Sequence, residues 1–191
     1  MALLETTNLF GDRPDLPEGM AYAEEIITRA EEQKLTHFIT ALPLTPFEFV
    51  GGLKGKRKVM SFGYRYDWGA HQLQQADEIP APLMSLREKA ATFAGIEAAR
   101  LQQALVTAYE RGAGIGWHKD RPQFDQVIGI SLLAPCLFRL RRKAGEKWER
   151  KAFTAQPRSA YLLSGASRSG WEHSIPGVKA LRFSVTFRSF R

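Results

Sequence analysis

Short alternating segments separated by turn residues fill the second half of the chain, and they constrain its fold more than any other feature. They are residues 104–109, 115–118, 127–133, 137–140, 160–163 and 181–187. Successive side chains of a strand point to opposite faces, so each segment predicts a strand with one buried face. Helical patterns are confined to the first half. The sequence therefore predicts an α+β fold whose strands form a two-sheet sandwich or barrel.

The helical patterns of the first half predict a layer that packs on this sheet structure. In Tyr22–Lys34, apolar residues recur at spacings of three and four. Thr36–Leu42 predicts a second short helix. Leu83–Phe93 is amphipathic, and Gly95 is a suitable stop. Residues 1–20 are rich in glycine and proline and predict an irregular arm.

Length and charge limit the class of protein. A chain of 191 residues fits one domain with a sizeable core, and we expect a monomer. The net charge of +7 favours a polyanionic partner, although many basic proteins bind nothing acidic. The single cysteine, Cys136, suits a reducing compartment, and neither a signal peptide nor a membrane-spanning run is present. We therefore expect a cytoplasmic protein with no membrane partner.

The triplet His118-Lys119-Asp120 is the first candidate for chemistry. In an extended segment, side chains two residues apart share a face, so the imidazole and the carboxylate converge. They supply two of the three ligands of a 2-His-1-carboxylate site, which leaves positions open on Fe(II). Gly112, Gly114 and Gly116 allow tight turns beside such a site. The alternative is a surface strand end.

A third ligand must come from another histidine. His37 lies in the helical region and His71 follows an aromatic segment. His173 follows a Gly/Ser-rich turn and starts an expected strand, a suitable place for a ligand near a barrel mouth. A lone histidine is more often structural or solvated, so the assignment of His173 depends on the strand that follows it.

That strand, Leu181–Phe187, alternates cleanly. Leu181 and the phenylalanines form a core face, while Arg182 and Arg188 frame two hydroxyl groups on the other. The two arginine Cα atoms are about 20 Å apart along a strand. Inward-leaning guanidinium groups can still reach a short dicarboxylate through paired hydrogen bonds. The alternative is a solvated edge strand.

A basic, glycine-rich segment precedes an aromatic one between residues 49 and 70. The rings that alternate along it are Phe62, Tyr64, Tyr66 and Trp68. Rings beside cations such as Arg57 suit an unstacked base and its phosphates. Core packing is the alternative for Phe62 and Trp68, whereas tyrosine hydroxyls suit the rim of a site.

These motifs together resemble the AlkB-like branch of the Fe(II)/2-oxoglutarate-dependent dioxygenases. The resemblance lies in His118-x-Asp120, His173 and Arg182-x5-Arg188, and it covers about the C-terminal half. Gly63-Tyr64-Arg65-Tyr66 is similar to the Gly-Tyr-x-Tyr segment of that family's nucleotide-recognition lid. The resemblance implies a double-stranded β-helix (jelly roll) core over residues 101–191. It also implies an N-terminal helical extension over 1–100, with the lid at about 50–72.

The resemblance also implies the roles of individual residues. The implied ligands of Fe(II) are His118, Asp120 and His173. Arg182 corresponds to the residue that pairs with the distal carboxylate of 2-oxoglutarate, and Arg188 lies near the iron-side carboxylate. Tyr109 corresponds to a tyrosine that hydrogen-bonds the co-substrate. Thr107 stands where the family often has asparagine.

The implied reaction is an O2-dependent oxidative demethylation of alkylated bases in DNA or RNA, which releases formaldehyde, succinate and CO2. The candidate substrate contacts are Tyr64, Tyr66, Arg57, Trp171 and Arg168. Trp117 alternates with His118 and is expected in the core. Two alternatives stay open: the same chemistry on a protein, lipid or small molecule, and a non-catalytic jelly-roll binding module. The second is disfavoured because every implied ligand and both arginines are present.

Overall fold

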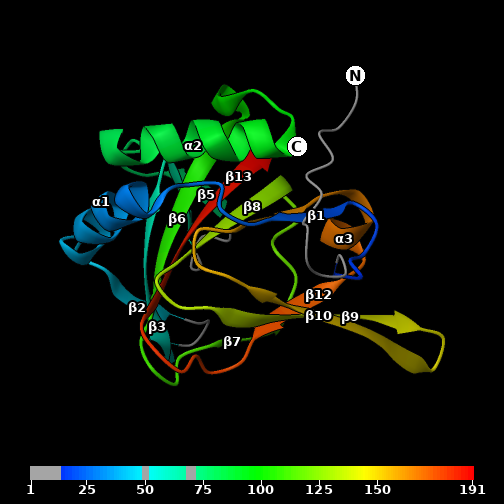
Figure 1. Ribbon diagram of the computed structural model, residues 1–191. Coiled ribbons are helices and arrows are strands. Elements are labelled where there is room, and N and C mark those ends of the chain that lie inside the picture. The colour runs from blue at the N-terminus through cyan, green and yellow to red at the C-terminus, as the bar shows by residue number, and fades with distance from the viewer. Residues whose placement is uncertain (1–13, 49–51, 68–71) are drawn as a thin grey trace.

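Two antiparallel sheets form the body of the molecule, which a computed structural model describes over residues 14–48, 52–67 and 72–191 (Figure 1). The larger sheet has the order β1 (Met20–Ala23), β11 (Ala160–Leu163), β8 (Phe124–Leu132), β13 (Arg182–Phe190), β6 (Leu101–Tyr109), β3 (Lys54–Phe62), β2 (Thr45–Glu48). The smaller has the order β10 (Lys147–Ala155), β9 (Cys136–Ala144), β12 (Glu172–Ile175), β7 (Ile115–His118). A separate ribbon pairs β4 (Tyr64–Asp67) with β5 (Gln72–Gln75). The predicted two-sheet α+β fold is confirmed.

The helices cover the outer face of the larger sheet. They are α1 (Arg29–Thr40) and α2 (Ala81–Ala94); a short α3 (Gly165–Ser169) and a 3-10 turn (Ala98–Arg100) complete the helical structure of the described ranges. Alternation along β13 sends Phe183, Val185 and Phe187 to this outer face, where they join Ile39 of α1 and Leu83 of α2 in one buried cluster. Burial of each such side chain contributes roughly 1.5–3 kcal/mol. Figure 1 shows both helices on one side and the smaller sheet on the other.

The start of α1 differs from the sequence-based expectation. Thr28 caps the helix and Glu31 closes a capping box, with the Thr28 N–H donating to Glu31 Oε2 at 2.7 Å. The helix expected over Tyr22–Lys34 therefore begins too early, and the separate helix over Thr36–Leu42 is wrong because α1 continues through it. Tyr22 instead lies in β1, which pairs with β11.

The helix predicted over Leu83–Phe93 is confirmed as α2, Ala81–Ala94. Its side chains Leu83, Leu86 and Ala90 are buried, and it ends at Gly95 with a left-handed φ of 69°. The larger sheet combines strands from residues 1–100 with strands from residues 101–191, since β3 pairs with β6 and β1 pairs with β11. The part of the predicted N-terminal arm that the structure describes, residues 14–19, has no regular element.

All six strands predicted in the second half of the chain are present, with two corrections to that half. β7 and β11 have the predicted bounds. The sequence did not reveal β10, because its many charged residues hide the strand alternation. Leu181 was expected in the core, but it lies before β13 and is 46% exposed.

The aromatic segment does not form one continuous ribbon. Gly63 has φ 74° and separates β3 from β4; a Cβ there would overlap the carbonyl group of Gln102. Phe62 therefore packs in the core while Tyr64 starts a separate hairpin. Trp68 and His71 lie outside the described residues. The inner face of the larger sheet, opposite the helices, is the face that positions the site.

Candidate metal and co-substrate site

A cavity of about 1610 Å³ opens between the two sheets. Its lining includes side chains from β3, β6 and β13 of the larger sheet and from β7 and β12 of the smaller. The β13 residues that line it, Ser184, Thr186 and Arg188, alternate with the apolar residues under the helices. One strand thus supplies both a core face and a polar cavity face.

Three metal-ligating side chains meet at this cavity. His118 of β7 and His173 of β12 are cross-strand partners, so both imidazoles project from the same face. Their ring centroids are 4.2 Å apart. Asp120 follows β7 and brings its Oδ2 to 3.6 Å from His173 Nε2. One ligand atom from each of the three residues lies within 4.8 Å of the others.

Neighbouring groups fix the orientation of both imidazoles. His118 Nδ1 lies 2.9 Å from the carbonyl oxygen of Gly116. A carbonyl oxygen only accepts, so Nδ1 carries the proton and Nε2 keeps its lone pair free. The His173 ring stacks on Phe138, with centroids 5.3 Å apart and an interplanar angle of 10°. Both rings are held before any metal binds.

Arg188 holds the carboxylate. Its Nε and Nη2 donate to Asp120 Oδ1 at 3.1 and 3.0 Å, and its Nη1 donates to Gln103 Oε1 at 3.0 Å. Burial alone would raise the pKa of the Asp120 carboxyl, but the Arg188 charge and then the neighbouring imidazoles bring that pKa well below its usual range. The carboxylate is therefore ionised, with Oδ2 left for another partner.

The protonation states suit a metal ion. Burial, followed by the charge of His118, lowers the pKa of His173 to about 3, and burial also lowers the pKa of His118. Both imidazoles are neutral near pH 7, which is the form that binds metals. Two neutral imidazoles and one carboxylate on a cavity wall fit Fe(II) with open positions.

Arg182 is a fully buried cation with unused donors. It is 0% exposed, and its Nη2 donates to Ser131 Oγ at 2.7 Å. Its Nε and Nη1 have no partner among the described residues. Leaving buried charged donors unpaired is costly. These unpaired charged donors suit a carboxylate partner.

Two tyrosines, Tyr109 and Tyr161, lie near the Arg182 guanidinium group. Tyr109 is the cross-strand partner of Arg182, and its ring centroid lies 4.9 Å from the Arg182 guanidinium carbon. Thr107, two residues earlier on β6, lines the same cavity. Tyr161 occupies the space over Gly129, where a Cβ would overlap its ring. Burial raises the pKa of Tyr161, so its hydroxyl stays protonated and able to donate.

Three polar residues of the site were missed from the sequence: Gln103, Ser131 and Tyr161. Gln103 shares the inward-facing alternation of β6 with Thr107 and Tyr109, and Ser131 lies between the buried Ile130 and Leu132 of β8; these positions are the signal that could have found them. Gln103 and Ser131 each accept a hydrogen bond from an arginine of β13: Gln103 from Arg188, and Ser131 from Arg182.

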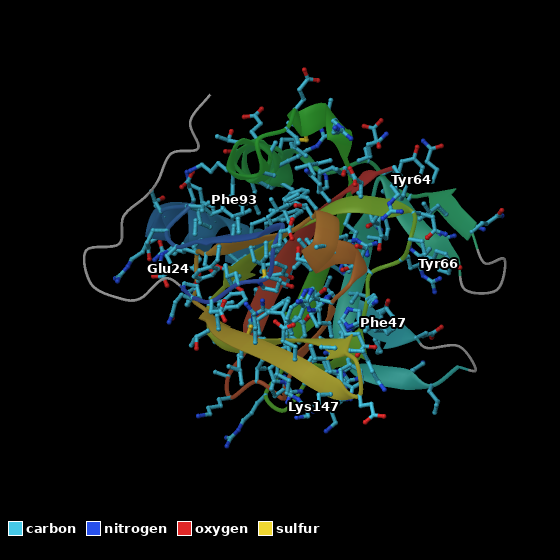
Figure 2. All side chains as sticks on the ribbon, turned by 90° about the vertical axis from the view of Figure 1, so that its right-hand side faces the viewer. Glu24, Phe47, Tyr64, Tyr66, Phe93 and Lys147 are labelled. Atoms are coloured by element: carbon cyan, nitrogen blue, oxygen red, sulfur yellow. The ribbon has the colours of Figure 1, made fainter. Side chains whose placement is uncertain are left out.

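Two of the residues expected at the substrate line the cavity and present charge or a ring to it. The Arg57 guanidinium carbon lies 3.9 Å from the ring centroid of Phe47, and burial lowers the pKa of Arg57. Tyr66 lies under the guanidinium group of Arg121, with 3.3 Å from the guanidinium carbon to the ring centroid. Figure 2 shows Tyr64, Tyr66 and Phe47 on one side of the molecule.

Three expectations are corrected by position, whereas Arg168 lies at the cavity as expected. Tyr64 does not line the cavity and packs edge-on against Phe190 at 4.9 Å. Trp171 is 2% exposed in the core between the sheets. Arg168 lines the cavity, but its Nη2 donates to the carbonyl groups of Arg121 and Phe124, so it holds the loop after β7. Trp117, expected in the core, is only half-buried and lies against arginine side chains.

The cavity lining is predominantly basic. Its cationic residues are Arg57, Arg65, Lys119, Arg121, Arg168, Arg188 and Arg191, against the acidic Glu48, Asp77 and Asp120. A concave surface lined by one sign of charge attracts ligands of the opposite sign. Within the described ranges, every helix is too short or too polar to span a lipid bilayer.

Comparisons with known proteins agree with this geometry. A family model for the 2OG-Fe(II) oxygenase superfamily matches residues 21–188. The "Alkylated DNA repair protein ALKBH8 homolog" of Arabidopsis thaliana is 28% identical over 185 residues, which is 84% of this chain and 51% of that protein. The mouse "tRNA (carboxymethyluridine(34)-5-O)-methyltransferase ALKBH8" is 28% identical over 167 residues, 84% of this chain and 24% of that protein. The chain thus spans about half of the length of the first relative and about a quarter of the second.

A solved structure, that of OsALKBH1, is similar in fold. It aligns with a TM-score of 0.68 over 94% of this chain and 99% of the solved chain, at 15% sequence identity. The expected α+β architecture with a jelly-roll core is confirmed by this likeness.

Proposed function

The chain belongs to the 2OG-Fe(II) oxygenase superfamily as an AlkB-like dioxygenase, and from this membership we propose that it oxidatively demethylates alkylated bases in DNA or RNA. The family uses Fe(II), 2-oxoglutarate and O2. The proposal rests above all on one observation: three metal-ligating side chains lie within 4.8 Å of one another in a cavity with many basic residues, and β13, which supplies Arg188 to that cavity, also carries a buried arginine, Arg182, with two unpaired donors.

We propose that His118, Asp120 and His173 hold the iron. Asp120 offers Oδ2 because Arg188 occupies Oδ1 through two hydrogen bonds. His118 offers Nε2 because Nδ1 is committed to the Gly116 carbonyl group. The bound iron supplies the activation of O2 that couples decarboxylation of 2-oxoglutarate to hydroxylation of a methyl group.

The co-substrate fits beside this cluster. In the proposal, the distal carboxylate of 2-oxoglutarate forms an ion pair with Arg182 and accepts a hydrogen bond from one of its unpaired donors, while Ser131 orients the guanidinium group. Tyr109 donates from its hydroxyl group, and Thr107 contributes a single hydroxyl in place of an amide. The two sheets enclose the reacting groups and limit the access of water.

The substrate enters from the basic side of the cavity. Tyr66 offers a ring for stacking and Arg57 a charge for the phosphate or the base edge. A base in a duplex must first be flipped out, at a cost of a few kcal/mol. Hydroxylation of its N-methyl group, followed by loss of formaldehyde, restores the base. The names of the relatives refer to DNA repair and to transfer RNA, so both nucleic acids are candidates.

The broader organisation is part of the same proposal. Residues 1–100 act as the extension that carries the lid, at about 50–72, and residues 101–191 act as the oxygenase core. The protein works as a monomer in the cytoplasm, consistent with its single buried cysteine, Cys136.

The test is an anaerobic titration with Fe(II) and 2-oxoglutarate, followed by an O2-dependent assay on a panel of methylated DNA and RNA oligonucleotides that includes transfer RNA. We expect formaldehyde and succinate in equal amounts, dependent on the oligonucleotide. Uncoupled succinate release with every oligonucleotide, together with product from a methylated peptide or small molecule, would refute nucleic acid as the substrate.

Three variants test the assigned residues. His118→Ala and Asp120→Ala are expected to abolish turnover while the melting temperature stays close to that of the parent. Arg182→Ala is expected to raise the 2-oxoglutarate concentration needed for half-maximal rate by more than tenfold, because charge-assisted hydrogen bonds are worth roughly 1.5–3 kcal/mol each. Full activity in either ligand variant, or an unchanged 2-oxoglutarate requirement, contradicts the assignment.

A further inference from the structure

The outer face of the smaller sheet carries a row of alternating cations and indole rings, which begins at the cavity edge and extends away from it. We call this row the arginine–tryptophan ladder: Trp117, Arg139, Arg141, Lys143, Trp148 and Arg150. The Arg141 guanidinium carbon lies 4.4 Å from the Trp117 ring centroid and 4.2 Å from that of Trp148. Arg139 lies 4.9 Å from Trp117, and Lys143 Nζ lies 5.6 Å from Trp148.

Strand alternation puts these side chains on one face. On β9, Phe138 and Leu140 are buried between the sheets, so Arg139 and Arg141 point outward. The β9–β10 register pairs Lys143 with Trp148 and Arg141 with Arg150. On β7, His118 faces the cavity, so Trp117 faces outward. The hairpin of β9 and β10 projects beyond the body of the molecule (Figure 1).

The ladder has surplus positive charge. Its acidic neighbour is Glu172, whose Oε2 accepts from Arg141 Nε at 2.6 Å. Arg139 Nε donates to a neutral group, Ser174 Oγ, at 3.1 Å. Lys143 and Arg150 are exposed and have no carboxylate partner within the residues that the structure describes. Cations that stack on aromatic rings while retaining free donors suit a polyanion that also carries flat rings.

We propose that this face binds single-stranded nucleic acid. Unpaired bases stack on exposed aromatic faces, while the phosphates between them contact the neighbouring cations. A duplex lacks free base faces, and a membrane surface would use the charges but not the ordered ring spacing. From β7 to β10 the ladder crosses three strand spacings, about 14 Å, which matches two or three nucleotides.

The ladder is continuous with the cavity. Trp117 lies on the edge strand β7, and it also lines the cavity that contains His118. A strand whose central base occupies the cavity would pass over this edge, with its flanking nucleotides on the ladder. This second step rests on the proposed function, whereas binding of an unmodified strand by the ladder does not.

The test measures binding of a fluorescein-labelled, unmethylated 12-nucleotide oligothymidylate by anisotropy, with the full chain loaded with Mn(II) and 2-oxoglutarate. The double variant Lys143→Gln/Arg150→Gln is expected to weaken binding at least fivefold. Its matched control, Arg29→Gln/Lys34→Gln, removes the same charge from exposed positions of α1 and is expected to change the affinity less than twofold. The ladder variant should also flatten the logarithmic salt dependence by about 1.4, since each phosphate contact on a single strand contributes about 0.7. Equal losses in the ladder variant and its control would overturn the inference.

Trp148→Ala separates stacking from charge. This substitution leaves the net charge unchanged. It is expected to weaken binding of the single-stranded oligonucleotide at least fivefold and binding of a 12-base-pair duplex less than twofold. Equal loss on the duplex, or preferred binding to phosphatidylserine vesicles that the same variants abolish, would overturn the single-strand assignment. Melting temperatures close to that of the parent exclude misfolding as the cause.

The two proposals fail in distinguishable ways. If the protein demethylates methylated oligonucleotides but the ladder variants bind oligothymidylate as well as the control does, only the ladder inference fails. If the ladder variants lose binding but no methylated nucleic acid is turned over, the ladder inference stands and the proposed function fails. Turnover of a methylated trinucleotide, which is too short to reach β10, is expected to be unchanged in Trp148→Ala.

Discussion

The buried guanidinium of Arg182 depends on one hydroxyl group for its orientation. Ser131→Ala removes the acceptor at 2.7 Å and leaves a third donor unpaired, so Arg182 can rotate away from the position that suits the co-substrate. We expect the dissociation constant for 2-oxoglutarate to rise about tenfold, with little change in kcat. Anaerobic calorimetry with Mn(II) measures this. The control is Ser159→Ala, whose hydroxyl group donates to the Gln156 carbonyl oxygen of its own turn at 2.6 Å. Equal affinity in Ser131→Ala and the parent would remove Ser131 from this role.

Arg188 connects the metal site to the larger sheet. Arg188→Lys keeps the charge but cannot bind Asp120 through two nitrogen atoms and Gln103 through a third. Loss of such support for a ligand typically costs 10–100-fold in metal affinity, and we expect an effect of about that size. A Co(II) absorbance titration provides the readout. Arg100→Lys, at an exposed pair with Asp125, serves as the control. A metal affinity within twofold of the parent in Arg188→Lys contradicts the prediction.

At the scale of elements, the capping box of α1 makes stability depend on pH. Hydrogen bonds from Lys89 and then from Thr28 lower the pKa of Glu31 from its ordinary 4.5 to about 2. A lowered pKa in the folded state contributes stability above pH 4.5, and that contribution is lost as the pH falls from 4.5 towards 2. Glu31→Gln is expected to lower the free energy of unfolding at pH 7 by roughly 0.5–2 kcal/mol.

The pH dependence distinguishes this contribution from general damage to the helix. In urea titrations, the difference between Glu31→Gln and the parent should shrink between pH 4.5 and pH 2.5. Glu88→Gln, at an exposed position of α2, should have little effect at either pH. A difference that stays constant across this range would show that Glu31 acts without its charge.

The turn between β3 and β4 decides how the lid leaves the sheet. Gly63→Ala combines an unfavourable positive φ with overlap of the Gln102 carbonyl group, so the hairpin must shift. We expect it to weaken oligonucleotide binding severalfold while 2-oxoglutarate affinity stays within twofold. Gly95→Ala is the matched control, since it has φ 69° but nothing within 4 Å of the added Cβ. Equal effects of the two substitutions on oligonucleotide binding would contradict a special role for the Gly63 turn.

How well each element could be predicted depends on whether its structural signal is visible in the sequence. β7, β11 and β13 alternate cleanly, so their existence and facing were predictable. The start of α1 was not, because the periodicity of Tyr22–Lys34 outweighed the local capping signal at Thr28. The lid was predicted as one ribbon because the alternation of aromatic residues continues past Gly63. The positive φ of Gly63, which separates β3 from β4, is not visible in that alternation.

The residues of the site also differ in how well the sequence predicted them. The metal cluster and Arg182 could be identified because few residue types fulfil those tasks. The supporting groups Ser131 and Gln103 are ordinary polar residues, and their function exists only through cross-strand contacts. Tyr64 was expected at the substrate because it belongs to the aromatic lid segment, and Trp171 because it borders His173 in the sequence. Packing of Tyr64 against Phe190, and of Trp171 in the core, removes both from the cavity surface.

At the scale of the whole molecule, the cavity joins the two sheets, so its ligands should stabilise both together. A ligand at 100 times its dissociation constant adds about 2.7 kcal/mol to the free energy of unfolding. We expect Mn(II) with 2-oxoglutarate to raise the melting temperature by several degrees and EDTA to reverse the shift. Hydrogen exchange should slow in β7, β12 and β13 and stay unchanged in α1. Protection restricted to one sheet would contradict a site that bridges both.

The position of β13 has a consequence for how the protein is made. This strand follows every other described strand in sequence, yet it lies between β6 and β8 in the middle of the larger sheet. During synthesis, β6 and β8 therefore leave the ribosome before β13, the strand that pairs with both of them in the larger sheet. Because Arg182 and Arg188 arrive on β13, the oxidising centre can assemble only after the scaffold around it has been synthesised.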